Sequence, residues 1–199
     1  MQKNIKGKKY EASELTGEDM YEYTFKGCSF TGANLRFTSF SRCDFIGCDF
    51  SKVLFNNTSF SYCSFPESNL SYISFSDVGI KECNFFKAVC KYSLFSRSKP
   101  GSPAEKKKYN MKGCNFQEAD LSNCIFENCD LKGCSFKRAN LVYVQFDWCD
   151  LEKVDFLQTD LSGINFNNSK IKETELDVDG FIQIGRSRGF VLHEDDTDE

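Results

Sequence analysis

The sequence predicts an all-β repeat array that folds into a rod, and three observations support this. The stretch CIFENCDLKGCSFKRANLVYVQF carries a large apolar residue every five positions, at Phe126, Leu131, Phe136, Leu141 and Phe146. Helices repeat an apolar face every 3.6 residues and strands every two, so this period fits neither. Two positions before each large residue stands a small one. Hydrophobic residues make up only 40% of the chain, which indicates a large surface relative to the core.

The large residues, which we term repeat centres, run in steps of five from Leu15 to Phe95. They resume, shifted by one residue, at Phe116 and continue to Leu176. The residue before a centre is often Asn, Asp or Ser, as in GANLR, CDFIG and EADLS. Short turns every five residues would let the backbone groups of one coil pair with those of the coils above and below.

This pattern, approximately A(D/N)LXX, resembles that of the pentapeptide-repeat family over about residues 10 to 179. The resemblance implies a right-handed quadrilateral β-helix, with five residues on each side and four sides to a coil. The 30 centres would then make about eight coils, interrupted by one inserted loop and followed by a short C-terminal cap. Each centre and the small residue two positions before it would point inward. Residues twenty apart would stack along the rod.

The eleven cysteines are expected to pack as small buried residues. Ten of the eleven stand two positions before a centre, and Cys90 is itself a centre. The stacked cysteines would have parallel Cβ vectors, which do not suit a disulfide. Their five-residue spacing differs from zinc-ribbon spacing, and the single His offers little nitrogen ligation, so we expect no metal site and no cofactor. The first residues lack the apolar core of a secretory signal, so reduced thiols in the cytoplasm are expected.

A loop is predicted at residues 96–112, where the five-residue spacing fails. It contains two of the three prolines, and clustered basic residues suggest a loop that contacts a partner. The alternative is a tolerated surface insertion without a role, since loops accept insertions at little cost. The candidate partner-binding residues are Arg97, Lys99, Lys106, Lys107, Lys108 and Tyr109.

Charge is distributed unevenly along the chain. Residues 1–113 carry a net charge of +6, residues 114–179 carry −7 and residues 180–199 carry −3. An acidic rod could occupy a basic nucleic-acid channel in the way that DNA does; the alternative is a merely soluble surface. The candidate DNA-mimicking residues are Glu118, Asp120, Glu127, Asp130, Asp147, Asp150, Glu152 and Asp160.

The repeat array is predicted to end at residue 179. Residues 180–193 are expected to form a cap or dimerisation segment, and residues 194–199 an acidic disordered tail. The stretch DGFIQIG predicts a short helix with Asp179 as its N-cap, and GFVL predicts a short strand. Apolar residues at a rod end favour capping or pairing with a second copy about a two-fold axis; a monomeric cap is the alternative. These residues are Phe181, Ile184, Phe190 and Leu192.

Residues 7–45 are similar to the N-terminal coils of the Qnr-type quinolone-resistance proteins, sharing a TGE turn and an F..C.F.GA.L run. The single long loop and the RGFVL stretch match features of that group, whereas its smaller, earlier loop is missing. The resemblance implies a dimeric, DNA-like rod that binds type II topoisomerases, DNA gyrase and topoisomerase IV, and shields them from quinolones. It also implies that the 96–112 loop contacts the topoisomerase.

Two functions therefore remain open: a topoisomerase-binding DNA mimic, and an interaction scaffold or effector with an unrelated protein partner. An enzyme is not expected, because no Ser-His-Asp arrangement, HExxH motif or phosphate loop is present. Direct nucleic-acid binding is not expected either, since the pI is about 5.2. No apolar run or basic amphipathic helix suggests membrane binding.

Overall fold

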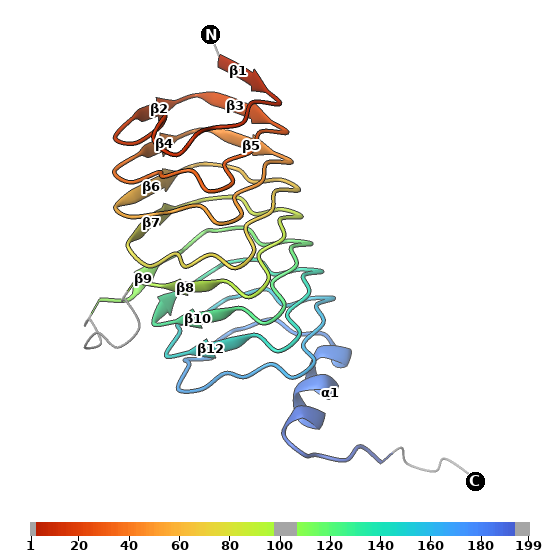
Figure 1. The fold of residues 1–199 in the computed structure, drawn as a ribbon. Helices are drawn as coiled ribbons and strands as arrows, with labels where there is room; N and C mark the ends of the chain where they lie inside the picture. The colour runs from red at the N-terminus through yellow and green to blue at the C-terminus, as the bar shows by residue number, and fades with distance from the viewer. Residues whose placement is uncertain (1–2, 98–106, 194–199) are drawn as a thin grey trace.

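The computed structural model describes residues 3–97 and 107–193. The chain winds into a rod of stacked parallel coils, with the N-terminal strand at one end and the C-terminal helix at the other (Figure 1). This confirms the predicted parallel β-helix. The solenoid makes about seven turns, against the eight coils expected from counting centres.

The strands are short, because a turn follows within a few residues of each centre. Most span three or four residues, and all pair in parallel with strands of neighbouring coils. In chain order the elements are β1 (Lys3–Lys6), β2 (Asp19–Tyr21), β3 (Tyr23–Lys26), β4 (Ser39–Ser41), β5 (Asp44–Ile46), β6 (Thr58–Ser61), β7 (Val78–Lys81), β8 (Leu94–Ser96), β9 (Tyr109–Asn110), β10 (Ile125–Glu127), β11 (Cys129–Asp130), β12 (Gln145–Asp147) and α1 (Val178–Ser187).

Each coil has four sides, which we number in chain order. Side one contains the sheet β1-β3-β5, and side two is held by isolated bridges such as Asp49 to Asn69. Side three contains β8-β10-β12, and side four contains β2-β4-β6-β7 and, separately, β9-β11. Strand partners stand twenty residues apart, as in Phe25 with Phe45 and Phe40 with Phe60. The predicted stacking of residues twenty apart is therefore confirmed outside the insertion.

The core consists of columns of stacked rings. Phe30 and Phe50, on side two of successive coils, lie with ring centroids 4.6 Å apart and planes 6° from parallel. Neighbouring sides meet edge to face, as Phe25 and Phe30 do at 5.5 Å and 75°. Both arrangements suit the quadrupole of the aromatic ring. The strand spacing thus sets the distance at which the rings stack.

The corners of the coil require an unusual backbone conformation. The residue two positions after almost every centre has a positive φ, for example 58° at Gly47 and 57° at Lys52. Left-handed backbone costs a residue other than glycine roughly 1–2 kcal/mol. The corner is held by hydrogen bonds in two directions. Within the turn, the Ala33 N–H donates to the Phe30 carbonyl at 2.8 Å, and between coils the Tyr62 N–H donates to the Lys81 carbonyl at 2.8 Å.

The small inward residues have a second role besides fitting the narrow interior. Many donate a hydrogen bond to the carbonyl of a centre in the preceding coil. The Thr58 hydroxyl reaches the Leu35 carbonyl at 2.7 Å, and the Cys63 thiol reaches the Phe40 carbonyl at 3.4 Å. All eleven cysteines are free and buried, as predicted. The preference for Cys, Ser and Thr at this position therefore reflects a donor requirement as well as size.

The C-terminal helix differs from its prediction. It begins at Val178, and its N-cap is Asp177, whose carboxylate accepts from the Gly180 N–H at 2.8 Å. The expected cap, Asp179, lies instead in the first turn, and the boundary predicted at residue 179 falls inside the helix. GFVL does not form a strand. A strand there would need a partner edge, whereas this segment extends beyond the last coil (Figure 1). Within residues 3–97 and 107–193, no helix is long and apolar enough to cross a membrane.

Candidate partner-binding surface

The insertion leaves the rod at the corner between sides three and four. Across it, strand and bridge partners stand 31 residues apart instead of twenty, as in Phe95 with Phe126 and Asn84 with Asn115. Eleven residues are therefore added. The repeat is intact through Arg97 and resumes at Tyr109, so the insertion is 98–108. This is shorter than the predicted loop 96–112, because both flanks still belong to the coil.

The predicted loop residues fall into three groups. Arg97, just before the insertion, and Lys107, within it, are exposed, and Lys108 is half-buried and donates from Nζ to the Trp148 carbonyl. Lys99 and Lys106 lie outside the described residues. Tyr109 is only 5% exposed, so its expected place on a loop surface is wrong. Burial in the solenoid raises the pKa of the Tyr109 phenol well above its usual range.

Tyr109 is the one aromatic residue at its position on side four of the described coils. The equivalent residues in the described coils are Glu18, Thr38, Thr58, Val78, Cys129, Cys149 and Ser169. The Tyr109 hydroxyl donates to the Val78 carbonyl at 2.7 Å. β9 pairs with β11 but not with β7, whereas sides one, two and three stay paired across the insertion. We infer that the Tyr109 ring holds β9 away from β7, and we call the resulting gap the ladder break.

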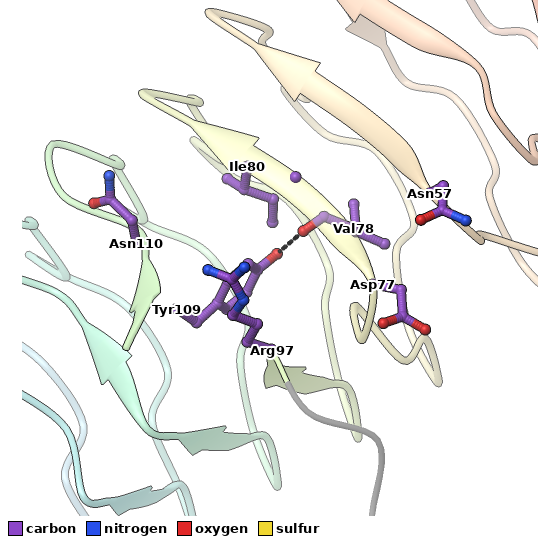
Figure 2. A pocket seen from close by; sticks show the side chains of 8 residues that line it. Asn57, Asp77, Val78, Ile80, Arg97, Tyr109 and Asn110 are labelled. Atoms are coloured by element: carbon purple, nitrogen blue, oxygen red, sulfur yellow. Dashed lines mark hydrogen bonds between the residues drawn. The ribbon is translucent and has the colours of Figure 1, made fainter. Parts of the chain in front are cut away.

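The ladder break opens into a cavity of about 400 Å³ (Figure 2). In this view Tyr109 extends from β9 toward β7, and Arg97 lies in front of it at the end of β8. The lining residues are Asn57, Asp77, Val78, Gly79, Ile80, Arg97, Tyr109 and Asn110. Polar side chains from three successive coils thus surround an interrupted sheet edge, directly beside the point where the insertion leaves the rod.

The eight predicted acidic residues do not form one face. Asp120 and Asp160 lie on side two, and Glu127 and Asp147 lie in register on side three. Side four carries Asp130, Asp150 and Glu152, and Glu118 lies at the corner after side one. The repeat fixes which residues point outward, but successive outward residues pass around all four sides.

Five of these carboxylates are paired with cations. The shortest contacts are Glu118 with Lys87 at 3.5 Å, Asp120 with Lys91 at 2.9 Å, Asp130 with Lys112 at 3.1 Å, Asp150 with Lys132 at 3.1 Å and Glu152 with Lys170 at 2.7 Å. Asp150 is only 8% exposed, contrary to the expectation of a solvated carboxylate. Most of the predicted acidic surface is therefore locally neutralised.

The pKa values follow from these contacts. Hydrogen bonds from Lys170 and Lys172 lower the pKa of Glu152 to about 2. Partial burial alone would raise the pKa of Asp150, but hydrogen bonding to Lys132 and the charge of Lys170 outweigh it and lower the value. The same balance holds for Asp120 with Lys91. All three carboxyls are ionised at neutral pH, and none is poised for acid–base catalysis.

Glu127, Asp147 and Asp160 form no ion pair among the described residues. Glu127 accepts from the Ser96 hydroxyl at 3.1 Å, and Asp147 accepts from the Asn168 amide at 3.5 Å. Trp148 follows Asp147 at the same corner of the rod and is 58% exposed. Sequence reasoning missed Trp148, although its place two positions after the centre Phe146 already indicated an outward corner residue.

The C-terminal end presents an apolar surface. Phe181, Phe190 and Leu192 are 72%, 74% and 57% exposed, and Ile184 is partly buried against the core. Together with Val191, which sequence reasoning missed, they line an apolar cavity of about 410 Å³. The predicted residues are thus brought together at one end, as a surface that a second copy could cover. A dimer remains a prediction.

Comparisons with known proteins agree with this architecture. The family model described as "Pentapeptide repeat region" matches residues 107–176, and "Pentapeptide repeats (8 copies)" matches 24–57 and 38–77. No curated protein matches the chain.

Several solved structures resemble it. A trypsin-treated variant of QnrB1, a plasmid-mediated fluoroquinolone resistance protein, is 22% identical with a TM-score of 0.73, over 97% of this chain and all of that one. Full-length QnrB1 is 19% identical with a TM-score of 0.43, over 95% and 98% of the two chains. HetL, from the cyanobacterium Nostoc sp. strain PCC 7120, is 15% identical with a TM-score of 0.31, over 87% of each. That protein is involved in regulating heterocyst differentiation.

Proposed function

The chain belongs to the pentapeptide-repeat family, and on that premise we propose that it is a non-enzymatic protein that binds type II topoisomerases, DNA gyrase or topoisomerase IV, and protects them from quinolones or related poisons. The observation that carries the proposal is the eleven-residue insertion at one corner of an otherwise regular solenoid. A rod that served only as a spacer would need no such insertion, and binding residues concentrate on loops held by rigid scaffolds.

Two further observations support the proposal. The chain matches the fold of a fluoroquinolone resistance protein from end to end. Around the insertion, Arg97 and Lys107 are exposed, and Glu127 lies in register with Ser96 and Asp147 on the adjoining side three, so this part of the rod offers both signs of charge to a partner. The carboxylates on the other sides are dispersed and largely paired with cations. We therefore expect DNA-like charge to contribute less to recognition than the corner does.

The second candidate is an interaction scaffold with an unrelated partner. The observation that favours it is that most of the predicted DNA-like carboxylates are paired with lysines, which leaves little of the charge pattern that a DNA mimic would present. The two candidate functions differ in the partner that the corner binds: a type II topoisomerase in the first and an unrelated protein in the second.

The test is gyrase-catalysed supercoiling in the presence of ciprofloxacin, with and without this protein. We expect added protein to restore supercoiling at drug concentrations that otherwise block it, and to associate with gyrase in the absence of drug. Unchanged inhibition over a wide protein range, without association with gyrase or topoisomerase IV, would leave the scaffold as the better account.

A further inference from the structure

The ladder break exposes backbone donors that are satisfied in the other coils. On side four, the N–H of a centre donates to the next coil, as Met111 does to the Asp130 carbonyl at 2.9 Å and Leu131 to the Asp150 carbonyl at 3.0 Å. Among the described residues, β7 is the last strand of its sheet and does not pair with β9, so the N–H of the centre Ile80 makes no such ladder bond. Its partner in an unbroken ladder would be the Asn110 carbonyl, which lies across the cavity.

The opposite edge of the cavity shows the same deficit. In regular coils the N–H before the centre donates to the coil above, as Ser59 does to the Thr38 carbonyl at 3.0 Å and Asp150 to the Cys129 carbonyl at 2.8 Å. In the described part of the chain, β9 pairs with β11 and not with β7, so the Asn110 N–H makes no ladder bond to the Val78 carbonyl, which accepts from the Tyr109 hydroxyl. The cavity therefore has an unpaired strand edge on each side, with one backbone donor on each edge outside the ladder.

Two properties of the cavity restrict what it can hold. Backbone N–H donors on facing strand edges can be satisfied by carbonyl oxygens of another segment. An exposed strand edge is also a template for an added strand. The outward residue of β7 at this point is Gly79, so no side chain covers the strand there. A volume of about 400 Å³ lies in the range of small-molecule pockets and accommodates a few residues of extended chain.

We propose that the ladder break is a docking slot for an extended main-chain segment of the protein partner, whose carbonyl groups accept from the Ile80 and Asn110 N–H groups. Binding by backbone makes the slot tolerant of side-chain sequence. Asn57, Asp77 and Arg97 at the rim then contact the side chains of the segment. This docking mode describes how a partner is held at the corner, and the identity of that partner rests on the proposed function.

The test is amide hydrogen exchange, followed residue by residue by NMR. In the free protein, we expect the Ile80 and Asn110 amides to exchange at least about tenfold faster than those of Met111 and Leu131, which are bonded in the ladder. A capped strand-forming hexapeptide, (Thr-Val)3, should slow exchange at Ile80 and Asn110 and leave Met111 and Leu131 unchanged. Purified DNA gyrase forms the second arm and should protect the same two amides.

A substitution gives an independent readout. Tyr109→Ser places at this position the residue that side four has at Ser169, so β9 can close on β7. We expect hexapeptide binding to fall about tenfold, as for the loss of a backbone hydrogen bond or two, while circular dichroism is retained. Tyr62→Ser is the matched control, because Tyr62 is outward and 45% exposed, and it should bind the hexapeptide as the wild type does.

Each outcome decides between the two proposals. If gyrase binds but the two amides still exchange freely, the slot is wrong and the proposed function stands. If the hexapeptide protects them but no topoisomerase binds, the slot stands and the proposed function fails. If both amides are protected in the free protein and become exposed when residues 98–108 are removed, the slot belongs to the chain's own insertion and the proposal is overturned.

Discussion

At the residue scale, two inward positions define each side of the coil, and they impose different demands. The centre must be large and apolar, because it fills the axis in a column of rings or branched chains. The residue two positions before it must be small, and a hydrogen-bond donor there satisfies a buried carbonyl, as Thr58 does for Leu35. Tyr109 departs from the second rule, and it does so where the sheet is broken.

The first prediction concerns the centres. Phe136 is fully buried and stacks on Phe116 at 5.0 Å, so Phe136→Ala should lower the free energy of unfolding by about 3–5 kcal/mol. Guanidinium unfolding followed by circular dichroism measures this. Phe37→Ala is the control, because Phe37 is 58% exposed, and it should change stability by less than about 1 kcal/mol. Equal effects of the two substitutions would contradict the inward assignment.

The second prediction concerns the thiols. Burial raises the pKa of Cys48, Cys124 and Cys134 to about 12, so almost no thiolate forms at these three at pH 8. Hydrogen bonding to Cys63 lowers the pKa of Cys43 and Cys83, but all eleven thiols are buried out of reach of a reagent. Iodoacetamide should leave the cysteines of the folded protein unmodified at that pH and alkylate all eleven in guanidinium, as read by intact mass. Rapid alkylation without denaturant would show that the coils open locally or that the thiols are exposed.

At this scale the sequence was a good guide wherever the repeat alone decides the answer. The five-residue spacing predicted the centres and the buried cysteines, because a residue's place in the repeat determines whether it faces the axis. It misassigned Tyr109, since basic residues on its N-terminal side made it look like part of the loop. The strand register shows that Tyr109 is an inward residue, because it pairs with Cys129 twenty residues further along the chain.

At the element scale, the insertion preserves the register of the solenoid on both of its flanks. Ser96 and Arg97 complete one corner, and Tyr109 and Asn110 begin the next side as β9. Because eleven residues are added between partners that otherwise stand twenty apart, removing those eleven restores the spacing. The register therefore places the boundaries of the insertion at residues 98 and 108, inside the predicted boundaries at 96 and 112.

The third prediction follows from that register. Deleting residues 98–108 should leave the thermal unfolding midpoint within a few degrees of the wild type, because the shortened chain keeps every inward residue inward. Deleting residues 97–108 instead removes one residue more and shifts the following side out of register, which turns apolar residues outward. Differential scanning calorimetry should show a large loss of stability for the longer deletion alone. Similar losses for both would mean that the insertion is structural.

The C-terminal helix shows where local signals are insufficient. Asp177 and Asp179 both fit an N-cap, and only the structure shows that the Asp177 carboxylate accepts from both the Gly180 and the Gln158 N–H groups. The second of these bonds ties the helix to the last coils, which no local pattern reveals. For the same reason GFVL could not be assigned from the sequence, because a strand depends on a partner edge that this end of the rod does not offer.

At the scale of the whole molecule, charge is arranged by the winding of the chain. The net charge of −7 over residues 114–179 suggested an acidic surface, but the residues that produce it are distributed around four sides. On side four, lysines and carboxylates of successive coils alternate and pair, as in Lys132 with Asp150 and Lys170 with Glu152. Composition predicts the total charge but not which residues share a side.

The fourth prediction is a pH dependence that arises from this pairing. The pKa values of Asp150 and Glu152 are lowered in the folded state, so their contribution to stability is present above the ordinary carboxyl range near pH 4 and is lost as the pH falls toward 2. The unfolding midpoint should therefore drop across that window, and less steeply in Glu152→Gln. Glu67→Gln is the control, since Glu67 forms no ion pair among the described residues, and it should follow the wild type.

We propose that a rigid solenoid presents one corner, built around the insertion, to a type II topoisomerase. The most direct test compares the wild type with the 98–108 deletion in gyrase supercoiling under ciprofloxacin, after circular dichroism has shown both to be folded. We expect the wild type to restore supercoiling and the deletion variant not to restore it. Equal restoration by the two proteins, or restoration by neither, would contradict it.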